Sequence, residues 1–295
     1  MTFALGKLRG KPVYTELAER CRAHSVMISP TPDLRKGGSG TFARYRDLCG
    51  IVGATHVLAQ HIDTETIYAP LQKTGDPTIF LNIPIRIKKT IYLETLDGIK
   101  ALQGSYWPEG ALDICFIQLD PPLFNYLLRI SGKKAIDLSK QRAKFVKDSQ
   151  KYYFSDQNNI WFWAVDGAPR DGAFQNNQGI LESRFDGLYV CGGSMQGKTY
   201  KTQPLTLVLP TYDDSADLIC HDLGPTTDLL PDKFGGISGG GMWQLSFSGK
   251  DGVPEEIDEM FFSGICVAGI QGECLYSRGP SALYDIFSKY LDIFC

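Results

Sequence analysis

Ser238 lies in a glycine-rich segment that could present a nucleophilic hydroxyl. Residues 236–241 read GISGGG and precede the apolar stretch 242–245. Glycine permits positive φ angles and lets another backbone or a ligand approach closely, so this pattern predicts a sharp turn that leads into a strand. A serine becomes a catalytic nucleophile only with a base for its proton, an acid that orients the base, and donors for the oxyanion.

Two upstream residues could supply the base and the acid. His56 follows the apolar run 49–55, so we expect it just past the end of a strand. Asp113 opens the apolar run 113–119, where a desolvated carboxylate needs a polar partner and an imidazole N–H would satisfy it. His61 is the nearest alternative base, but it lacks the strand that leads into His56.

The strand patterns predict an all-β fold of two packed β-barrels. We expect a helix over 15–27, helical content in a linker that follows Pro121 and Pro122, and an amphipathic helix from Ser281. The acidic run 255–259 is interpreted as a solvated loop. The expected strands are residues 41–45, 48–52, 79–85, 90–93, 114–119, 160–165, 187–191, 205–209, 242–247 and 260–270.

Three short motifs resemble those of trypsin-like serine peptidases. Residues 54–58, ATHVL, resemble the A-A-H segment of that family. Residues 113–119, DICFIQL, resemble D-I-A-x-L-x-L, and residues 236–240, GISGG, are similar to G-D/N-S-G-G. The order histidine, aspartate, serine is also that of chymotrypsin-like enzymes. The resemblance covers roughly residues 38–290 and implies two packed six-stranded barrels.

The resemblance also implies a role for each motif residue. His56 would act as general base and then as general acid, and Asp113 would orient it and stabilise its charged form. Ser238 would form the acyl-enzyme. The backbone N–H groups of Gly236 and Ser238 would form the oxyanion hole.

Substrate-binding residues follow from the same resemblance. Val267, Ala268 and Gly269 resemble the strand that pairs with the substrate backbone. Asp232 precedes Ser238 where the family often places the residue at the base of the primary specificity pocket. An acid there would favour Lys or Arg before the cleaved bond.

These assignments predict one peptidase unit over residues 1–295. Its expected parts are an N-terminal helical extension 1–36, an N-terminal barrel 37–122, a linker 123–151, a C-terminal barrel 152–280 and a C-terminal helix 281–295.

Composition excludes several other classes of protein. The chain is 43% hydrophobic and 21% charged, with a net charge of −3, so no basic surface for nucleic acid is expected. No segment reads as an export signal or a membrane span. None of the eight cysteines forms a C-x-x-C pair, which disfavours a zinc site, and we expect neither metal nor cofactor. We expect a cytoplasmic protein that acts on proteins or peptides.

Two alternatives remain open at this point. Ile237 stands where the family usually has an acidic or polar residue, which favours either gating by a partner or a catalytically inert, peptide-binding module of the same fold. Residues 192–199, GGSMQGKT, match a phosphate-binding loop, so a nucleotide-dependent enzyme is the second alternative. Such a loop must open a helix, whereas Pro204 and residues 205–209 favour a strand, so we interpret the segment as a hairpin loop.

Overall fold

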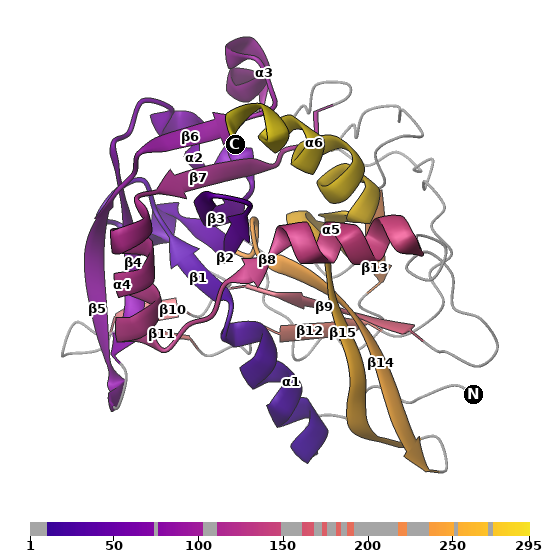
Figure 1. Cartoon of the computed structure of the whole chain (residues 1–295). Coiled ribbons are helices and arrows are strands. Elements are labelled where there is room, and N and C mark those ends of the chain that lie inside the picture. Colours follow the sequence, from indigo (N-terminus) through magenta and orange to yellow (C-terminus); the bar gives the residue numbers. More distant parts are fainter. Residues whose placement is uncertain are drawn as a thin grey trace.

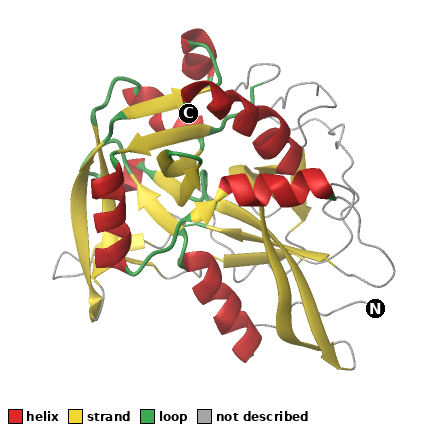
Figure 2. Ribbon diagram, viewed as in Figure 1, coloured by secondary structure: helices red, strands yellow, loops and turns green. Residues whose placement is uncertain are grey.

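The chain folds into antiparallel sheets with a few short helices (Figure 1; Figure 2). This strand-rich architecture agrees with the expected all-β class. The computed structural model describes residues 11–73, 76–102, 111–148, 161–167, 173–175, 181–183, 188–191, 218–222, 236–250, 253–270 and 274–295. The predicted strand 205–209 and the segment 192–199 lie outside these residues.

The first sheet has six strands, in the order β1-β2-β3-β7-β6, with β8 added in parallel to β2. All its other pairings are antiparallel. A two-stranded sheet, β4-β5, lies beside it, and the backbones of Ser29 and Tyr68 form a bridge just beyond β1. The bounds are β1 (Ser25–Ile28), β2 (Gly38–Tyr45), β3 (Leu48–Gly53), β4 (Thr66–Lys73), β5 (Asp76–Arg86), β6 (Lys89–Tyr92), β7 (Cys115–Leu119) and β8 (Ile136–Asp137).

The second sheet also has six strands, in the order β12-β9-β14-β15-β16-β13, and all its pairings are antiparallel. Its long β14–β15 hairpin extends away from the first sheet (Figure 1). The bounds are β9 (Trp161–Asp166), β12 (Leu188–Cys191), β13 (Leu218–Asp222), β14 (Gly241–Lys250), β15 (Val253–Ile270) and β16 (Cys274–Arg278), with a separate pair β10 (Ala173–Gln175) and β11 (Leu181–Ser183).

Helices pack against both sheets (Figure 2). A turn of 3-10 helix, η2 (Leu34–Lys36), lies between β1 and β2. The others are α1 (Pro12–Arg22), α2 (Thr55–Leu58), η3 (Ala59–His61), α3 (Leu96–Ala101), α4 (Pro121–Ser131), α5 (Leu138–Lys147), the π-helical η6 (Ser281–Phe287), α6 (Ser288–Leu291) and η7 (Asp292–Phe294).

Strands β3 and β7 are buried on both faces, which explains their nearly continuous apolar sequences. Ile51 and Ile117 belong to a core that also contains residues of β4, β5 and α4. Val52 and Phe116, one position along each strand, belong to a second core shared with α1, β14, β15 and the C-terminal helix. Successive side chains of a strand point to opposite faces, so these two strands connect the two cores.

The N-terminal helix begins and ends earlier than the sequence predicts. Proline suits the first helical position because it has no N–H to lose, and α1 begins at Pro12. It ends at Arg22, and residues 25–27, expected to be helical, belong to β1 (residues 25–28) instead. Val26 and Ile28 are β-branched and buried against β2, so strand pairing overrides the local helix propensity.

Pro121 and Pro122 end the strand pattern and form the first turn of α4, so helical structure begins directly after β7. One other expectation about an irregular segment is wrong. The acidic run 255–259 is not a solvated loop but part of β15, where Ile257 faces inward and its acidic neighbours are largely exposed. Of these five residues only Ile257 is buried, and the pairing with β14 is irregular between Ile257 and Glu259, so the four acidic residues fit in the hairpin without entering the core.

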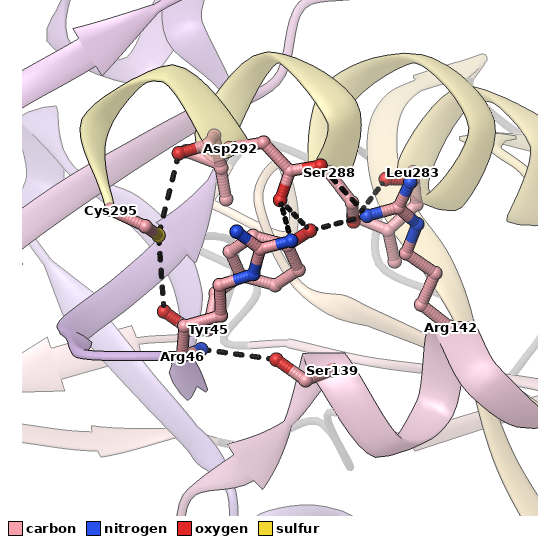
Figure 3. A network of polar contacts seen from close by, with 9 residues as sticks. Tyr45, Arg46, Ser139, Arg142, Leu283, Ser288, Asp292 and Cys295 are labelled. Atoms are coloured by element: carbon pink, nitrogen blue, oxygen red, sulfur yellow. Dashed lines mark hydrogen bonds and ion pairs between the residues drawn. The ribbon is translucent and has the colours of Figure 1, made fainter.

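The C-terminal segment is tied to the first sheet by polar contacts (Figure 3). The Tyr45 hydroxyl donates to the Asp292 carboxylate over 2.5 Å, and a guanidinium nitrogen of Arg142 in α5 lies 3.1 Å from the other carboxylate oxygen. A guanidinium nitrogen of Arg46 lies 2.9 Å from Asp292. The chain end therefore crosses from the second sheet back onto the first.

No helix among the described residues is long and apolar enough to cross a membrane. In the same part of the chain, no group of three or more His, Cys, Asp and Glu side chains is arranged to hold a metal ion.

Candidate active site

His56 and Asp113 meet at one edge of the first sheet. The end of β3 pairs with the start of β7, with Gly53 opposite Cys115. His56 is the second residue of α2, just after β3, and Asp113 lies two residues before β7. Antiparallel pairing of these two strands therefore brings the two side chains together from positions far apart in the sequence.

The two side chains form a close, directed contact. The Nδ1 atom of His56 lies 2.6 Å from Oδ2 of Asp113, and the backbone N–H of His56 donates to Oδ1 over 2.8 Å. The Asp113 side chain is fully buried, whereas 26% of the His56 side chain is exposed. An ionised carboxylate can only accept hydrogen bonds, so this contact favours the neutral tautomer of His56 in which Nδ1 carries the proton and Nε2 has the lone pair.

The Ser238 turn is held by the backbones of both sheets. Gly239 N–H donates to the Cys266 carbonyl in β15, and Cys266 N–H donates to Gly240. On the other side, Ser39 of β2 donates its N–H to the Ser238 carbonyl over 2.7 Å. The turn therefore connects the second sheet to the first.

The same turn packs closely against the helix that contains His56. A Cβ atom placed on Gly239 would lie 3.0 Å from the backbone nitrogen of Ala54, the residue that caps α2. A Cβ atom placed on Gly38 would lie within 3.0 Å of both the Ser238 carbonyl oxygen and the Val57 side chain. Glycine is therefore required at both positions to bring the serine segment beside the histidine helix.

The turn geometry also orients one predicted oxyanion donor. The Ile237 carbonyl accepts from Gly240 N–H, and in a planar trans peptide the following N–H, that of Ser238, points the opposite way. Gly236 has a φ of 95°, which only glycine adopts readily, and its carbonyl accepts from the Ser39 hydroxyl.

Ile237 is fully buried, and a Cβ atom on Gly167 would lie 2.7 Å from its side chain. An apolar side chain at this position therefore contributes to the packing between β9 and the turn.

The other predicted site residues are Val267, Ala268, Gly269 and Asp232, with His61 as the alternative base. Val267, Ala268 and Gly269 directly follow Cys266 in β15, so the predicted substrate strand begins where the serine turn is attached. Asp232 lies outside the described residues. His61, the alternative base, lies in η3, and the Asp113 carboxylate contacts His56 instead.

Two charged residues near Asp113 were not identified from the sequence. Glu94, just after β6, accepts the backbone N–H of Asp113 over 2.7 Å. Arg278, at the end of β16, donates through Nε to the Leu112 carbonyl over 3.0 Å and through Nη2 to the Ala111 carbonyl. Two local features could have pointed to them. Thr55 stands where the trypsin-like family has alanine, and Arg278 is a charged residue at the end of a strand.

Burial changes the ionisation of both residues. It raises the pKa of Glu94, and the negative charge of Asp113 adds to that effect. Burial lowers the pKa of Arg278 to about 10, against the opposing effect of the Asp113 and Glu94 carboxylates. Arg278 is thus a buried cation beside two acidic groups.

Arg278→Met is expected to destabilise the protein by about 3–5 kcal/mol, because it leaves the two carboxylates without this buried cation. Urea unfolding of both proteins measures the difference. Arg46→Met is the matched control. Arg46 is 53% exposed in its ion pair with Asp292, so we expect a change of about 0–1 kcal/mol. Equal small losses in the two variants would contradict a structural role for Arg278.

Gly239→Ala is expected to cost about 2–5 kcal/mol. Its φ of 87° disfavours any side chain, and the added Cβ would lie 2.0 Å from the Ser39 carbonyl oxygen. Gly98→Ala in α3 is the control, because its Cβ meets only ordinary contacts and alanine favours a helix. Thermal unfolding compares the two, and an unchanged midpoint for Gly239→Ala would rule out the close packing of the turn.

No known protein-family model matches this chain, and no curated protein matches it either.

Proposed function

We propose that this chain is a trypsin-like serine endopeptidase in which His56, Asp113 and Ser238 form the catalytic triad. One observation above all supports it. The Nδ1 atom of His56 lies 2.6 Å from the buried Asp113 carboxylate, while the glycine-flanked Ser238 turn packs against the helix that contains His56. Three residue types that acyl transfer requires thus lie in neighbouring segments of the two sheets.

In this proposal Ser238 Oγ attacks the carbonyl carbon of a peptide bond, and Nε2 of His56 takes the serine proton. Asp113 keeps the Nδ1 proton in place and stabilises the imidazolium that forms. The imidazolium then gives its proton to the departing amine, which leaves an ester between the substrate acyl group and Ser238. Water, deprotonated by His56, hydrolyses this ester and restores the enzyme.

Two groups of residues would bind the substrate. The N–H groups of Gly236 and Ser238 would stabilise the oxyanion, and residues 267–269 would pair with the substrate backbone. Asp232 would favour Lys or Arg before the cleaved bond, since a carboxylate attracts a cationic side chain.

The proposal also covers the shape of the two sheets and the cellular compartment. Each six-stranded sheet would curl into a barrel with the site between the two, and no cofactor or metal would be needed. The buried cysteines Cys21, Cys49 and Cys115 suit a reducing compartment such as the cytoplasm. There, a protease would need gating by a partner or ligand.

A second candidate is a latent or inert binding module of the same fold. Buried Ile237 favours it, because the chain has no acidic or polar side chain at this position that could help to shape the oxyanion loop. A partner would then have to complete that loop, or the serine would never react.

Incubation of the purified chain with a mixture of peptides tests the proposal. We expect new peptide ends, enriched in Lys or Arg before the cut, that are absent with Ser238→Ala protein purified in parallel. Cleavage that appears only after cell lysate is added to the wild type would indicate a latent enzyme. No Ser238-dependent cleavage under either condition would favour the inert module.

A further inference from the structure

We propose that Glu94 is a positioning residue whose carboxylate fixes the relative placement of Asp113 and the helix that contains His56. The expected catalytic consequence rests on the proposed peptidase function, whereas the effect on the His56–Asp113 contact does not.

Glu94 connects the segment that contains Asp113 with the start of the helix that contains His56. Its Oε1 atom accepts the Asp113 N–H over 2.7 Å, and its Oε2 atom accepts the Thr55 hydroxyl over 3.2 Å. Thr55 N–H in turn donates to the Asp113 carbonyl over 3.2 Å. The three residues close a ring of hydrogen bonds directly beside the 2.6 Å contact between His56 and Asp113.

The ring of hydrogen bonds restrains an unusual backbone conformation of Asp113. Its φ is 57°, in the left-handed region, which aspartate adopts more readily than most residues other than glycine but still at a cost. In this conformation the carboxylate receives both the ring and the backbone N–H of His56. A relaxed Asp113 backbone would redirect the carboxylate and break at least one of these two contacts.

A carboxylate suits this position better than an amide. The Asp113 N–H and the Thr55 hydroxyl are both donors to it, and a carboxylate offers two acceptor oxygens where a glutamine offers one. Among the residues that the structure describes, the charged or titratable groups that interact with Glu94 include Asp113, the Arg278 guanidinium and the Cys115 thiol. Arg278 partly offsets the repulsion between the two carboxylates.

This arrangement also explains a departure from the peptidase pattern. Thr55 stands where trypsin-like peptidases usually have alanine, and its hydroxyl donates to Glu94. We therefore expect the position of the Glu94 carboxylate to depend on the Thr55 hydroxyl.

Proton NMR of the His56 ring tests the inference. The Nδ1 proton, shifted downfield by Asp113, is assigned with His56→Gln, and Asp113→Ala, which places no donor opposite Nδ1, defines its position without the carboxylate. Under the proposal, Glu94→Ala moves the signal toward that limit and lowers kcat about 100-fold with little change in KM. Glu94→Gln and Thr55→Val should produce smaller changes in the same direction. Exposed Glu65→Ala is the control, with no change expected.

The outcomes separate the two proposals. A folded Glu94→Ala protein with an unchanged Nδ1 signal would overturn the role of Glu94. If that variant fails to fold, unchanged signals in both Glu94→Gln and Thr55→Val would overturn it equally. If the chain cleaves no peptide but the signal responds to Glu94, the peptidase proposal fails and the positioning role holds.

Discussion

Ser238→Ala should lower the turnover of peptide substrates by on the order of 10⁶-fold, to the rate supported by binding and oxyanion stabilisation alone. The change removes one oxygen from a half-buried position in the turn and leaves the backbone contacts with Ser39 and Cys266 in place. Substrate binding should therefore be nearly unchanged. Single-turnover measurements with excess enzyme separate the loss in the chemical step from any change in affinity.

Ser248→Ala is the matched control for this prediction. Ser248 lies in β14, the strand that follows the serine turn, and is exposed. We expect wild-type turnover from it. If Ser238→Ala keeps most of the activity, another residue is the nucleophile and the triad assignment is wrong.

Asp113→Asn should lower kcat by about 10⁴-fold while the fold is preserved. An asparagine amide can donate to Nδ1 of His56 and would then leave the ring proton on Nε2, the atom that must accept the serine proton. The effect acts through the 2.6 Å contact with Nδ1, so it falls on the chemical step rather than on substrate affinity. The comparison of kcat with KM for wild type and variant measures it.

Asp120→Asn provides the control at the other end of the same strand. Asp120 directly follows β7 and is exposed, and it makes no side-chain capping contact with α4. Its replacement should leave kcat unchanged. A loss below tenfold for Asp113→Asn, in a protein with native stability, would contradict the orienting role of Asp113.

The sequence predicted those parts of the fold that depend on local patterns. Apolar runs with β-branched residues correctly predicted β3 and β7, because both strands are buried on both faces apart from Gln118 of β7. The placement of His56 after β3 followed from the same pattern. Asp113 was expected to open β7, and it precedes that strand by two residues.

Other parts depend on contacts that no local pattern encodes. The residues 25–28 extend a helix-favouring segment, and only their pairing with β2 makes them a strand. Glu94 and Arg278 approach Asp113 from β6 and β16, which are separated in the sequence by most of the chain. Ser39, which holds the serine turn, is likewise recognisable only once the two sheets are placed together.

The charged residues around Asp113 suggest why the site spans both halves of the chain. Arg278 comes from the second sheet and contacts the backbone of residues 111 and 112, whereas Ser39 of the first sheet contacts the serine turn of the second. Each half therefore stabilises the segment that presents the other half's proposed catalytic residue. Separate expression of either half should not yield a reactive serine.

Reaction with a fluorophosphonate probe, followed by mass-spectrometric mapping of the modified residue, tests the proposed triad most directly. The account predicts one modified residue, Ser238, in the wild type. Labelling should be much slower in His56→Gln, because the serine then lacks its base, and absent in Ser238→Ala. Modification of a different residue, or labelling of Ser238 at the same rate without His56, would contradict it.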